Sequence, residues 1–355
     1  MKYRIGIVGS GSISGAHSYA FDRINESRGD IQVEKVVMCS RNVSSERCRE
    51  LGWSEAEHEW EKVVSRDDID VIDICAYDSV HYPAAKAALE CGKMVICEKP
   101  IADNYEQASE LAAIAEAKNI NATVCTNYRY MHDIRCMKHM IEEGKLGEIR
   151  HVYGSFTMDW AANVNGWMNW RLDHRTSPLG TLGDLGTHLI DMCRFMGLEF
   201  AEVCGMDEVY GRRRPCGENC FAETESNELS IFNARFTNGA LGLFELSRVS
   251  GGGNGMIFEV HGTEGNIRWE KRNMNSLLTV PEGSWRYDST PSGEILPYDY
   301  GFEREFIQND TFTLLFRDFL TQNGKAPTLR DGAECSRVID AVLKSDREKK
   351  FVKII

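Results

Sequence analysis

The sequence lacks any long uninterrupted run of apolar residues, although 42% of its 355 residues are hydrophobic. A membrane-spanning helix needs roughly 18 or more consecutive apolar residues, so no transmembrane segment is predicted. The first residues, MKYRIGIVGSG, have the pattern of a strand followed by a turn and lack the form of a signal peptide. We therefore expect a cytoplasmic protein.

The twelve cysteines lack the paired spacing of a zinc site. Two of them, Cys216 and Cys220 in CGENC, are four residues apart and could bridge or bind a metal, but no second Cys/His pair accompanies them. A surface loop is the favoured interpretation, and no metal site is predicted. Most of the others lie in apolar segments and are expected to be small core residues in a reducing compartment: Cys39, Cys75, Cys97, Cys125 and Cys193.

The sequence has fewer basic than acidic residues, 41 Lys and Arg against 54 Asp and Glu, which gives a formal net charge of -13. Such a surface repels nucleic acid and anionic membranes, so neither is an expected partner. Repeats and low-complexity tracts are also lacking. A chain of 355 residues is too long for one ordinary core, and we expect about two domains.

Residues 1–127 alternate short apolar strands with helices. This alternation predicts a doubly wound parallel sheet covered by helices on both faces. The expected strands are 2–9, 33–40, 70–76, 94–99 and 122–127, and the expected helices follow residue 15 and cover 44–52, 83–93 and 105–118.

Residues 128–355 have a different sequence pattern. Apolar residues recur with period two in segments such as ELSIFNARF, GALGLFELSRV and GMIFEVHG. Turn signals at Gly239, 251–253 and Gly265 separate these segments and predict a mostly antiparallel sheet in an α+β domain. Residues 281–301 are expected to form a long loop, of the kind that often binds ligands. Helices are predicted at 133–143, 186–196, 306–320 and 332–345, and the last two should pack against the sheet or the first domain.

A glycine pattern lies directly after the first strand and before a helix: Gly9, Gly11 and, in the third position, Ser14. The first glycine permits a tight turn, the second lets the backbone approach a pyrophosphate, and a small third residue packs the helix on the strand. The helix N-terminus supplies N–H donors and a positive dipole end at Ser12 and Ile13. The pattern predicts dinucleotide binding.

The end of the second strand predicts which dinucleotide fits, because a carboxylate there binds the ribose hydroxyls and rejects a phosphate. Ser40 and Arg41 occupy this position. The missing acid and the guanidinium favour NADP slightly, but an arginine can also cover adenine. The choice between NAD and NADP therefore stays open.

Lys99 ends the strand of VICEKP, at the edge where ligands bind in a doubly wound sheet. Pro100 disfavours a helical conformation for Lys99, and Glu98 is a candidate charge partner or cofactor contact. Alone, a lysine in this position is more often a solvated surface residue. A second motif changes that balance.

The second motif is GTLGDLGTHLIDM, in which Asp184 and His188 are four residues apart and share one face of a predicted helix. An acid beside an imidazole can hold one tautomer and raise the basicity of the ring, so His188 could take a hydroxyl proton at neutral pH. A capping Asp and a core His are an equally good interpretation of these two residues alone. Asp191 is expected to be a structural hydrogen-bond or ion-pair partner.

Taken in order, several segments resemble the Gfo/Idh/MocA family of glucose-fructose oxidoreductases and inositol dehydrogenases. They are the glycine loop, AYDSVHYPAAKAALECGKMVICEKP (76–100), NYRY (127–130), GDLGTH (183–188), and FTNGALGLFELSRV (236–249) with HGTEGNI (261–267). The resemblance covers essentially the whole chain. It implies a Rossmann domain at 1–127 and a substrate-binding and oligomerisation domain at 128–355, whose sheet often forms a homodimer or homotetramer interface.

The resemblance also implies that Lys99, Asp184 and His188 meet at the nicotinamide. His188 would act as general base, Lys99 would stabilise the alkoxide, and Asp184 would orient His188. Departures from the commonest pattern are Ser14, the Ser40–Arg41 pair and Thr181. His17 and His81 are expected to be structural, because neither has an acid at helical spacing.

Two sets of binding residues follow from these patterns and the resemblance. The expected cofactor-binding set is Gly9, Gly11, Ser12, Ile13, Ser40, Arg41, Ala76, His81, Glu98, Lys99, Asn127, Trp170 and Arg171. The expected substrate-binding set is Lys99, Tyr128, Arg129, Trp167, Asp184 and His188, with Trp170 as a further flat face for a sugar ring. For Arg129, Arg171 and the aromatic residues, packing and surface pairing are equally good interpretations.

The predicted activity is oxidation of a hydroxyl of a sugar, sugar derivative or cyclitol with NAD or NADP. One alternative is a glycosidase or lyase that uses NAD for a transient oxidation. A non-catalytic nucleotide-binding sensor is the other, and it has no evident need of Lys99, Asp184 and His188 together.

Overall fold

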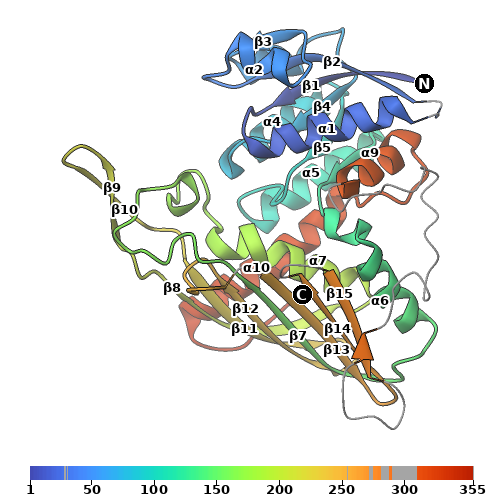
Figure 1. Cartoon of the computed structure of the whole chain (residues 1–355), viewed down its shortest axis with the longest axis vertical. Helices are drawn as coiled ribbons and strands as arrows, with labels where there is room; N and C mark the ends of the chain where they lie inside the picture. The colour runs from blue at the N-terminus through green and yellow to red at the C-terminus, as the bar shows by residue number, and fades with distance from the viewer. Residues whose placement is uncertain are drawn as a thin grey trace. The chain divides into compact units, whose positions relative to one another are not determined.

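The fold is that of a computed structural model, which describes residues 1–27, 29, 31–253, 255–271, 275–280, 288–289 and 310–354 (Figure 1). The chain forms two compact units. Unit 1 contains Met1–Tyr130 and Tyr300–Glu334, and unit 2 contains Met131–Asp299 and Cys335–Ile355. Within the described part of the chain, none of the helices has both the length and the apolar character needed to cross a membrane. The predicted loop at 281–301 lies outside the described residues, apart from 288–289.

Unit 1 contains a parallel sheet with the strand order β3-β2-β1-β4-β5-β6. This is the order of a dinucleotide-binding doubly wound sheet, and it confirms the predicted fold class. The strands are β1 (Lys2–Val8), β2 (Gln32–Cys39), β3 (Glu55–Glu57), β4 (Val71–Ile74), β5 (Met94–Cys97) and β6 (Ala122–Val124). The helices are α1 (Ser12–Glu26), α2 (Ser45–Glu50), α3 (Trp60–Val64), α4 (Asp78–Glu90), α5 (Tyr105–Lys118) and α9 (Thr311–Thr321), with a short 3-10 turn η1 (Asn127–Tyr130).

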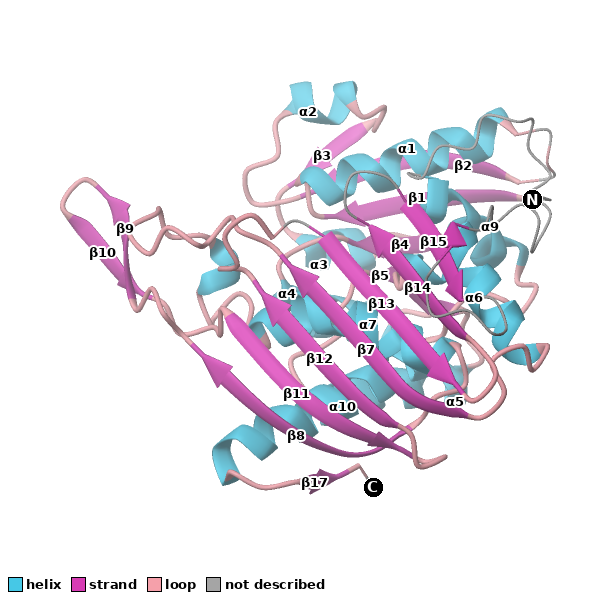
Figure 2. Cartoon of the chain, turned by 60° about the horizontal axis from the view of Figure 1, so that its bottom comes forward, coloured by secondary structure: helices cyan, strands magenta, loops and turns pink. Residues whose placement is uncertain are grey.

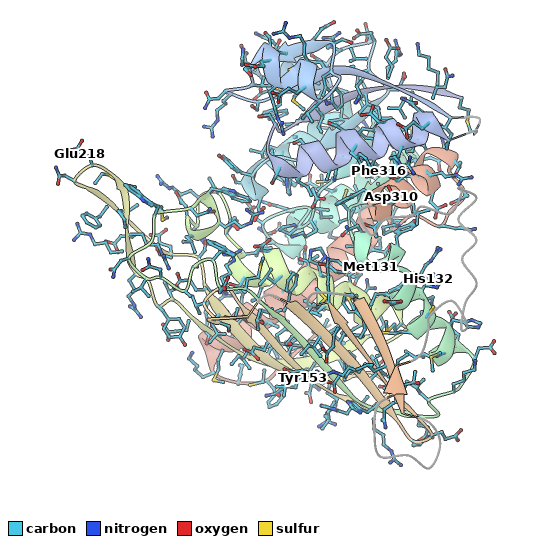
Figure 3. All side chains as sticks on the ribbon, in the orientation of Figure 1. Met131, His132, Tyr153, Glu218, Asp310 and Phe316 are labelled. Carbon is cyan, nitrogen blue, oxygen red and sulfur yellow. A yellow bond between two sulfur atoms is a disulfide. The ribbon has the colours of Figure 1, made fainter. Side chains whose placement is uncertain are left out.

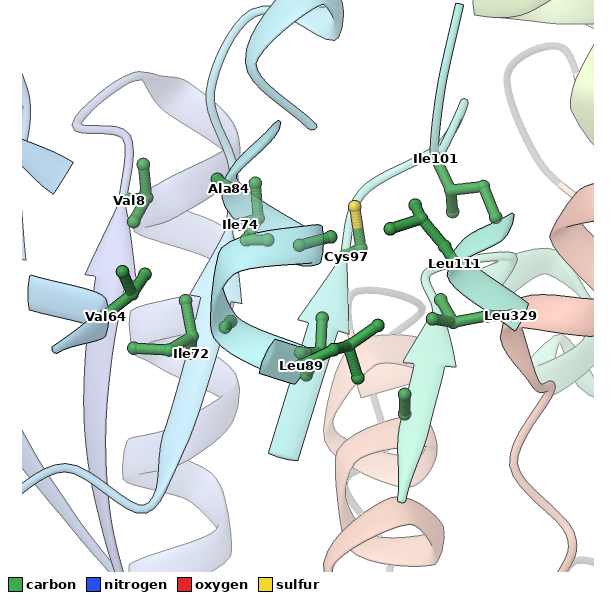
Figure 4. Close-up of a cluster of buried hydrophobic side chains, with 14 of the residues drawn as sticks. Val8, Val64, Ile72, Ile74, Ala84, Leu89, Cys97, Ile101, Leu111 and Leu329 are labelled. Carbon is green, nitrogen blue, oxygen red and sulfur yellow. The ribbon is translucent and has the colours of Figure 1, made fainter. Parts of the chain in front are cut away.

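Helices cover both faces of this sheet. Because successive residues of each strand point to opposite sides, most strand residues are therefore buried. Ile72, Ile74 and Cys97 pack with Leu89 and Leu111 of α4 and α5 (Figure 4). The other face packs against α1 and α9 through a second cluster, which contains Ile5, Ile7, Ile96, Phe21 and Phe316. Strands buried on both faces explain the continuous apolar runs in the sequence.

Helix α4 begins earlier than predicted. It starts at Asp78, whereas the sequence favoured a start near Pro83. Pro83 therefore lies inside the helix, and His81 lies in its first turns with its side chain buried. The acidic residue Asp78 in the first turn suits the positive end of the helix dipole, and this local effect favours the earlier start.

Unit 2 contains a sheet with the order β16-β15-β14-β13-β7-β12-β11-β8-β17 among the described residues (Figure 2). Its pairs are antiparallel except β7–β12, which is parallel, so the predicted mostly antiparallel sheet is confirmed. The strands are β7 (Ile149–Thr157), β8 (Phe200–Glu208), β11 (Leu229–Phe236), β12 (Leu241–Ser247), β13 (Gly255–Gly262), β14 (Asn266–Lys271), β15 (Asn275–Val280), β16 (Asp288–Ser289) and β17 (Val352–Lys353).

Helices of unit 2 cover one face of this sheet. A Cβ on Gly154 of β7 would lie 3.3 Å from Leu189 of α7 (Thr187–Phe195), and one on Gly205 of β8 would lie 2.6 Å from Val342 of α10 (Leu329–Glu348). Since side chains alternate along a strand, Met206 and Leu243 point to the opposite face, where they are exposed. Helix α6 (His132–Glu142) also belongs to unit 2 and lies close to the predicted 133–143.

A two-stranded hairpin, β9 (Arg213–Gly217) and β10 (Cys220–Glu223), carries the CGENC segment, with Glu218 at its tip (Figure 3). Cys216 and Cys220 form a disulfide across the turn. The predicted surface position is confirmed, and the bridge corrects the expectation of a plain loop. The base of the hairpin is fixed by an ion pair between the buried side chains of Arg214 and Glu228.

Candidate active site

The glycine loop follows β1 and crosses closely over the end of β4. Gly9 has a positive φ of +125°, and a Cβ there would lie 2.3 Å from the carbonyl oxygen of Cys75. The Gly9 N–H donates to the carbonyl oxygen of Cys39, at 2.7 Å, which ties the loop to β2 as well. Only glycine fits this position, as the pattern predicted.

The next part of the loop leaves room for a ligand. A Cβ on Gly11 would meet no atom within 4 Å, and Gly11 and Ser12 are exposed. Helix α1 begins at Ser12, and within the described chain no side chain caps its N-terminal N–H groups. Open backbone donors at the positive end of a 15-residue helix fit an anionic pyrophosphate.

Ser40 and Arg41 follow β2, beside this loop. The Ser40 hydroxyl is 2.7 Å from the Ser10 hydroxyl, and the Ser40 carbonyl oxygen is 3.2 Å from Nδ1 of His58. Arg41 is exposed. These two predicted residues therefore lie next to the glycine loop, in the place where a ribose or its phosphate is read in this fold.

Ala76, Glu98 and Lys99 follow the neighbouring strands β4 and β5, so the structure brings them to the same edge of the sheet as the glycine loop. His81 lies in α4, and its ring nitrogens face two backbone carbonyl oxygens: that of Pro100 at 2.6 Å and that of Ala76 at 3.2 Å. His81 thus fixes the backbone of Ala76 and Pro100 at the edge of the sheet where a cofactor is expected. Lys99 is half-buried, and its peptide bond to Pro100 is cis.

The Glu98 side chain turns into the protein rather than toward solvent. It is 7% exposed, and its Oε2 accepts a hydrogen bond from the Lys99 backbone N–H at 3.1 Å. Its Oε1 lies 3.2 Å from Nε2 of His17. Burial raises the pKa of the Glu98 carboxyl. Hydrogen bonding and charge from His17, with a smaller contribution from the charge of Lys99, outweigh this effect, so the net pKa lies below its usual value.

Residues of the NYRY segment make contacts within unit 1. Asn127 donates to the Thr311 hydroxyl at 3.0 Å, and Arg129 pairs with Asp331 at 3.0 Å. Tyr128 is buried. Arg129 therefore has an internal carboxylate partner, which the sequence did not indicate.

In unit 2, the GDLGTH segment is not one continuous α-helix as predicted. Leu182–Gly186 forms a π-helical turn, and α7 follows directly from Thr187. Gly183 and Gly186 allow a wider turn to lie close to the sheet, where a Cβ on Gly186 would be 2.9 Å from Leu246. Single π turns of this kind often mark functional sites. Asp184 lies in the π turn, and His188, which is 9% exposed, lies in the first turn of α7.

Two arginines bind the Asp184 carboxylate. Its Oδ2 is 3.0 Å from a terminal nitrogen of Arg248 and 3.3 Å from Nε of Arg171. Arg248 is fully buried and also donates to the carbonyl oxygens of Arg171 and Gly180, at 2.8 and 3.0 Å. The predicted acid therefore lies between two arginines, of which Arg248 is fully buried and Arg171 is partly exposed.

The aromatic residues before this helix divide into two kinds. The Arg171 guanidinium stacks over the Trp170 ring, 4.2 Å from its centroid. Trp167 is 69% exposed, which leaves a flat apolar face accessible. Asp191, expected to be structural, is buried within α7.

Sequence patterns missed three residues that contact the candidate site: His17, Asp73 and Arg248. Asp73 carried a usable signal, since it is a carboxylate inside the apolar strand segment DVIDICA and must find a partner when buried. His17 was named only as an expected structural residue and Arg248 was not singled out, because the partners of both come from distant parts of the sequence.

Comparison with known proteins agrees with this geometry. Residues 3–126 match a family model described as the NAD-binding Rossmann fold of an oxidoreductase family, and residues 138–354 match the C-terminal alpha/beta domain of the same family. The chain belongs to the Gfo/Idh/MocA oxidoreductase family. Its N-terminal part is thus an NAD-binding Rossmann domain.

Members of this family resemble the chain over almost its whole length. Levoglucosan dehydrogenase of Pseudarthrobacter phenanthrenivorans is 28% identical, with 99% of this chain and 97% of the relative covered. The scyllo-inositol 2-dehydrogenase (NADP(+)) of Bacillus subtilis is 24% identical, with 98% and 95% covered. The solved structure of levoglucosan dehydrogenase with NADH and levoglucosan superposes with a TM-score of 0.89 at 27% identity, with both chains fully covered.

Proposed function

We propose that this protein oxidises a hydroxyl group of a sugar, a sugar derivative or a cyclitol, with a nicotinamide dinucleotide as hydride acceptor. The observation that carries the proposal is the full-length match to both domains of an oxidoreductase family, in which similar members are named as dehydrogenases of levoglucosan and scyllo-inositol. The open glycine loop at the N-terminus of α1 supports the nucleotide part of the proposal.

The proposed reaction assigns one role to each of three side chains. The imidazole of His188 takes the hydroxyl proton, since a histidine titrates near neutral pH. The ammonium of Lys99 stabilises the negative charge that develops on the substrate oxygen. Asp184, held by Arg171 and Arg248, orients His188, which lies four residues later in the sequence. The bound nicotinamide supplies the hydride acceptor.

The remaining predicted residues are assigned to binding. We propose that Gly11, Ser12 and Ile13 hold the pyrophosphate and that Ser40 and Arg41 contact the ribose or its phosphate. Ala76, His81, Glu98 and Asn127 shape the cofactor edge in unit 1. On the substrate side we assign Tyr128, Arg129, Trp167, Trp170 and Arg171.

NAD and NADP are both compatible with the end of β2, where Ser40 leaves space and Arg41 offers a guanidinium. Among the relatives, levoglucosan dehydrogenase was solved with NADH, and the scyllo-inositol enzyme is named for NADP(+). We retain a slight preference for NADP from Arg41. Parallel assays with both nucleotides test this preference.

The test is a screen of monosaccharides, inositols and anhydrosugars, followed by the absorbance of the reduced nicotinamide. We expect net reduction with at least one polyol, and a loss of turnover of about 10²- to 10⁴-fold in Lys99→Ala and in His188→Ala, with nucleotide binding still measurable. Near-normal rates in either variant would remove that residue from the reaction.

The same screen separates the other functions. Products formed without net cofactor reduction would favour a lyase or glycosidase that uses transient oxidation. Tight nucleotide binding without any conversion of any polyol would favour a sensor.

We also propose that the protein forms a homodimer or homotetramer in the cytoplasm through the exposed face of the unit 2 sheet. Met206, Leu241 and Leu243 are 63%, 50% and 38% exposed on this face, an unusual load of apolar side chains for solvent. Sedimentation of Leu241→Glu/Leu243→Glu should show dissociation. An unchanged sedimentation coefficient would place the interface elsewhere.

A further inference from the structure

His17 lies in the second turn of α1 and is completely buried between two carboxylates. Its Nδ1 is 3.0 Å from both oxygens of Asp73, in the middle of β4. Its Nε2 is 3.2 Å from Oε1 of Glu98, which follows β5. One imidazole ring therefore connects the helix of the glycine loop to two neighbouring strands.

This geometry defines the charge on the ring. An ionised carboxylate only accepts hydrogen bonds, and a neutral imidazole has a single N–H. Two carboxylates facing the two ring nitrogens are both satisfied only when the ring is an imidazolium. The positive charge also offsets the cost of burying two negative groups.

Other groups around the ring are consistent with this charge. Burial lowers the pKa of His17, but the charges and hydrogen bonds of Asp73 and Glu98 more than offset that effect and raise it to about 9. Cys75 lies 3.0 Å from Nδ1, and burial raises the pKa of its thiol and of the Cys125 thiol, so both stay neutral near the ring.

Two aromatic rings of α9 close the site from the remaining side. The centroids of Phe312 and Phe316 lie 4.6 and 4.8 Å from that of His17, and Figure 3 labels Phe316 in α9. Asp73, Glu98, Cys75 and Cys125 are the titratable groups that face the ring from β4, β5 and β6 or the residues after them. The ring is therefore isolated from solvent.

The second carboxylate oxygen of Glu98 connects His17 to the backbone of Lys99. While Oε1 faces His17, Oε2 accepts from the backbone N–H of Lys99. Rotation of the carboxylate would break both contacts together. The position of the Lys99 backbone thus depends on a bond made by a helix that begins at the glycine loop.

We propose that His17 is a positioning residue for Lys99: its buried imidazolium fixes the Glu98 carboxylate, which in turn holds the backbone of the lysine. This inference rests on the proposed role of Lys99 in hydride-transfer chemistry. It also gives a physical path by which the glycine loop is linked to the reacting end of the site.

A bound metal is the competing explanation, because His17, Asp73 and Cys75, or His17, Glu98 and Cys125, group donor atoms within 4.8 Å of one another. The imidazolium accounts for both ring nitrogens at once, since each lies at hydrogen-bond distance from its own carboxylate. A metal would occupy one nitrogen and leave the other facing the second acid.

The experiment compares four variants of the full-length protein. His17→Gln removes the charge, and Glu98→Leu removes the bridge. In both, we expect kcat to fall about 10- to 100-fold, and in His17→Gln the dissociation constant of the nucleotide should change less than about threefold. Glu98→Gln is the conservative variant, because its amide oxygen can accept from Lys99 and its NH₂ can donate to a neutral His17. Its kcat should stay at least about fivefold above that of Glu98→Leu, and the matched control Asp73→Asn should keep kcat within about threefold.

Two spectroscopic measurements do not depend on turnover. Nitrogen-15 correlation spectra of the histidine rings should show both nitrogens of His17 protonated at pH 7.5 in the wild type and only Nδ1 protonated in Glu98→Gln. The backbone amide of Lys99 should exchange slowly with solvent in the wild type and in Glu98→Gln, and at least tenfold faster in His17→Gln.

These readouts separate the inference from the proposed function. If the wild type converts no polyol, the function fails, and the ring spectrum and the Lys99 exchange rate still decide the inference. A neutral His17 ring in the wild type, normal kcat in His17→Gln, or a loss that follows nucleotide affinity would overturn it. Stoichiometric metal in the purified protein that disappears in His17→Gln would replace it with a metal site.

Discussion

Two glycines in the dinucleotide loop constrain the chain in different ways. Gly9 combines a positive φ with a position in which any Cβ would collide with the Cys75 carbonyl oxygen. Gly11 has an ordinary backbone conformation and open space around the missing Cβ. The first glycine is thus required by the fold, whereas the second is required only by a ligand that approaches the backbone.

The pair of variants Gly9→Ala and Gly11→Ala tests this difference. Gly9→Ala should lower the free energy of unfolding by several kcal/mol or prevent soluble expression, since both the backbone and the Cys75 contact oppose it. Gly11→Ala should unfold like the wild type but bind nucleotide at least tenfold more weakly. Urea unfolding and nucleotide titration give the two quantities. Equal stability of both variants would contradict the assignment.

Arg248 is the residue on which the Asp184 network depends. Arg248→Met removes one of the two arginines described at Asp184 and, with it, the donors to two backbone carbonyl oxygens, so we expect a stability loss of about 3 to 5 kcal/mol together with lower kcat. Arg235→Met is the matched control, because that arginine pairs with Glu202 while 53% exposed, and it should cost less than about 1 kcal/mol. Denaturant unfolding and steady-state kinetics of both variants provide the check. Similar losses in the two variants would rule out a special role for Arg248.

At the residue scale, the sequence singled out the residues that carry local signals and assigned no site role to those that do not. Glycines at fixed offsets after a strand, and a lysine before a proline, are features of adjacent residues. The partner of a buried charge is set by which strands become neighbours. For this reason Asp73 could be flagged as a buried acid, but its ring partner His17, on another element, could not be named.

Among the elements, the segment that carries Asp184 and His188 shows how a helix is placed on a sheet. The π turn Leu182–Gly186 lies against β12, and a Cβ on Gly186 would be 2.9 Å from Leu246. The sequence prediction placed Asp184 and His188 on one face of a regular α-helix. The wider π turn changes the direction in which the Asp184 side chain leaves the backbone. Glycines at both ends of GDLG were the available signal for an irregular turn.

Gly186→Ala should push this segment away from β12. The added methyl group meets only the end of the Leu246 side chain, so we expect the free energy of unfolding to fall by about 1 to 3 kcal/mol. If His188 is the base, kcat should fall as well. Leu246→Val shortens the opposing side chain, and the double variant should recover most of the lost kcat. Steady-state kinetics of the two single variants and the double variant test this. Additive losses in the double variant would show that the two residues do not compete for space.

The accuracy of the element predictions follows the strength of the periodicity. Five strands of unit 1 (β1, β2, β4, β5 and β6) and helix α5 were predicted within a few residues, because apolar runs, caps and glycines mark them clearly. The sequence did not predict the short strand β3 in unit 1, nor, in unit 2, strands β7, β8, β9, β10, β14, β15, β16 and β17. The parallel pairing of β7 with β12 joins residues 149–157 to 241–247, and local patterns carry no information on pairing at that separation.

At the scale of the whole molecule, the chain does not divide at a single point. Helix α9 follows the unit 2 strands in the sequence, yet it belongs to unit 1 and stacks Phe316 on Phe21 of α1, with ring centroids 5.0 Å apart. The amphipathic pattern of 306–320 predicted a buried face, and residues 311–320 confirm the helix, while 306–309 lie outside the described residues. Amphipathicity indicates that a face is buried, but it does not indicate which partner covers it.

The buried imidazolium of His17 links the stability of the protein to pH. Its pKa in the folded protein is about 9, against about 6.5 in an unfolded chain. Between these values the folded state holds a proton that the unfolded state releases, so folding takes up a proton. The stabilisation is therefore fully present below about pH 6.5 and is lost as the pH rises toward 9.

We predict that the free energy of unfolding of the wild type falls by about 2 kcal/mol between pH 6.5 and 8, and that His17→Gln lacks this part of the fall. Thiols of Cys75, Cys97 and Cys125 have pKa values raised by burial, so they add a similar loss of stability, but mainly above about pH 8.5, where unfolded thiols ionise. Urea unfolding at closely spaced pH values below 8 isolates the histidine. Parallel curves for wild type and His17→Gln over that range would mean that His17 is not charged in the folded protein.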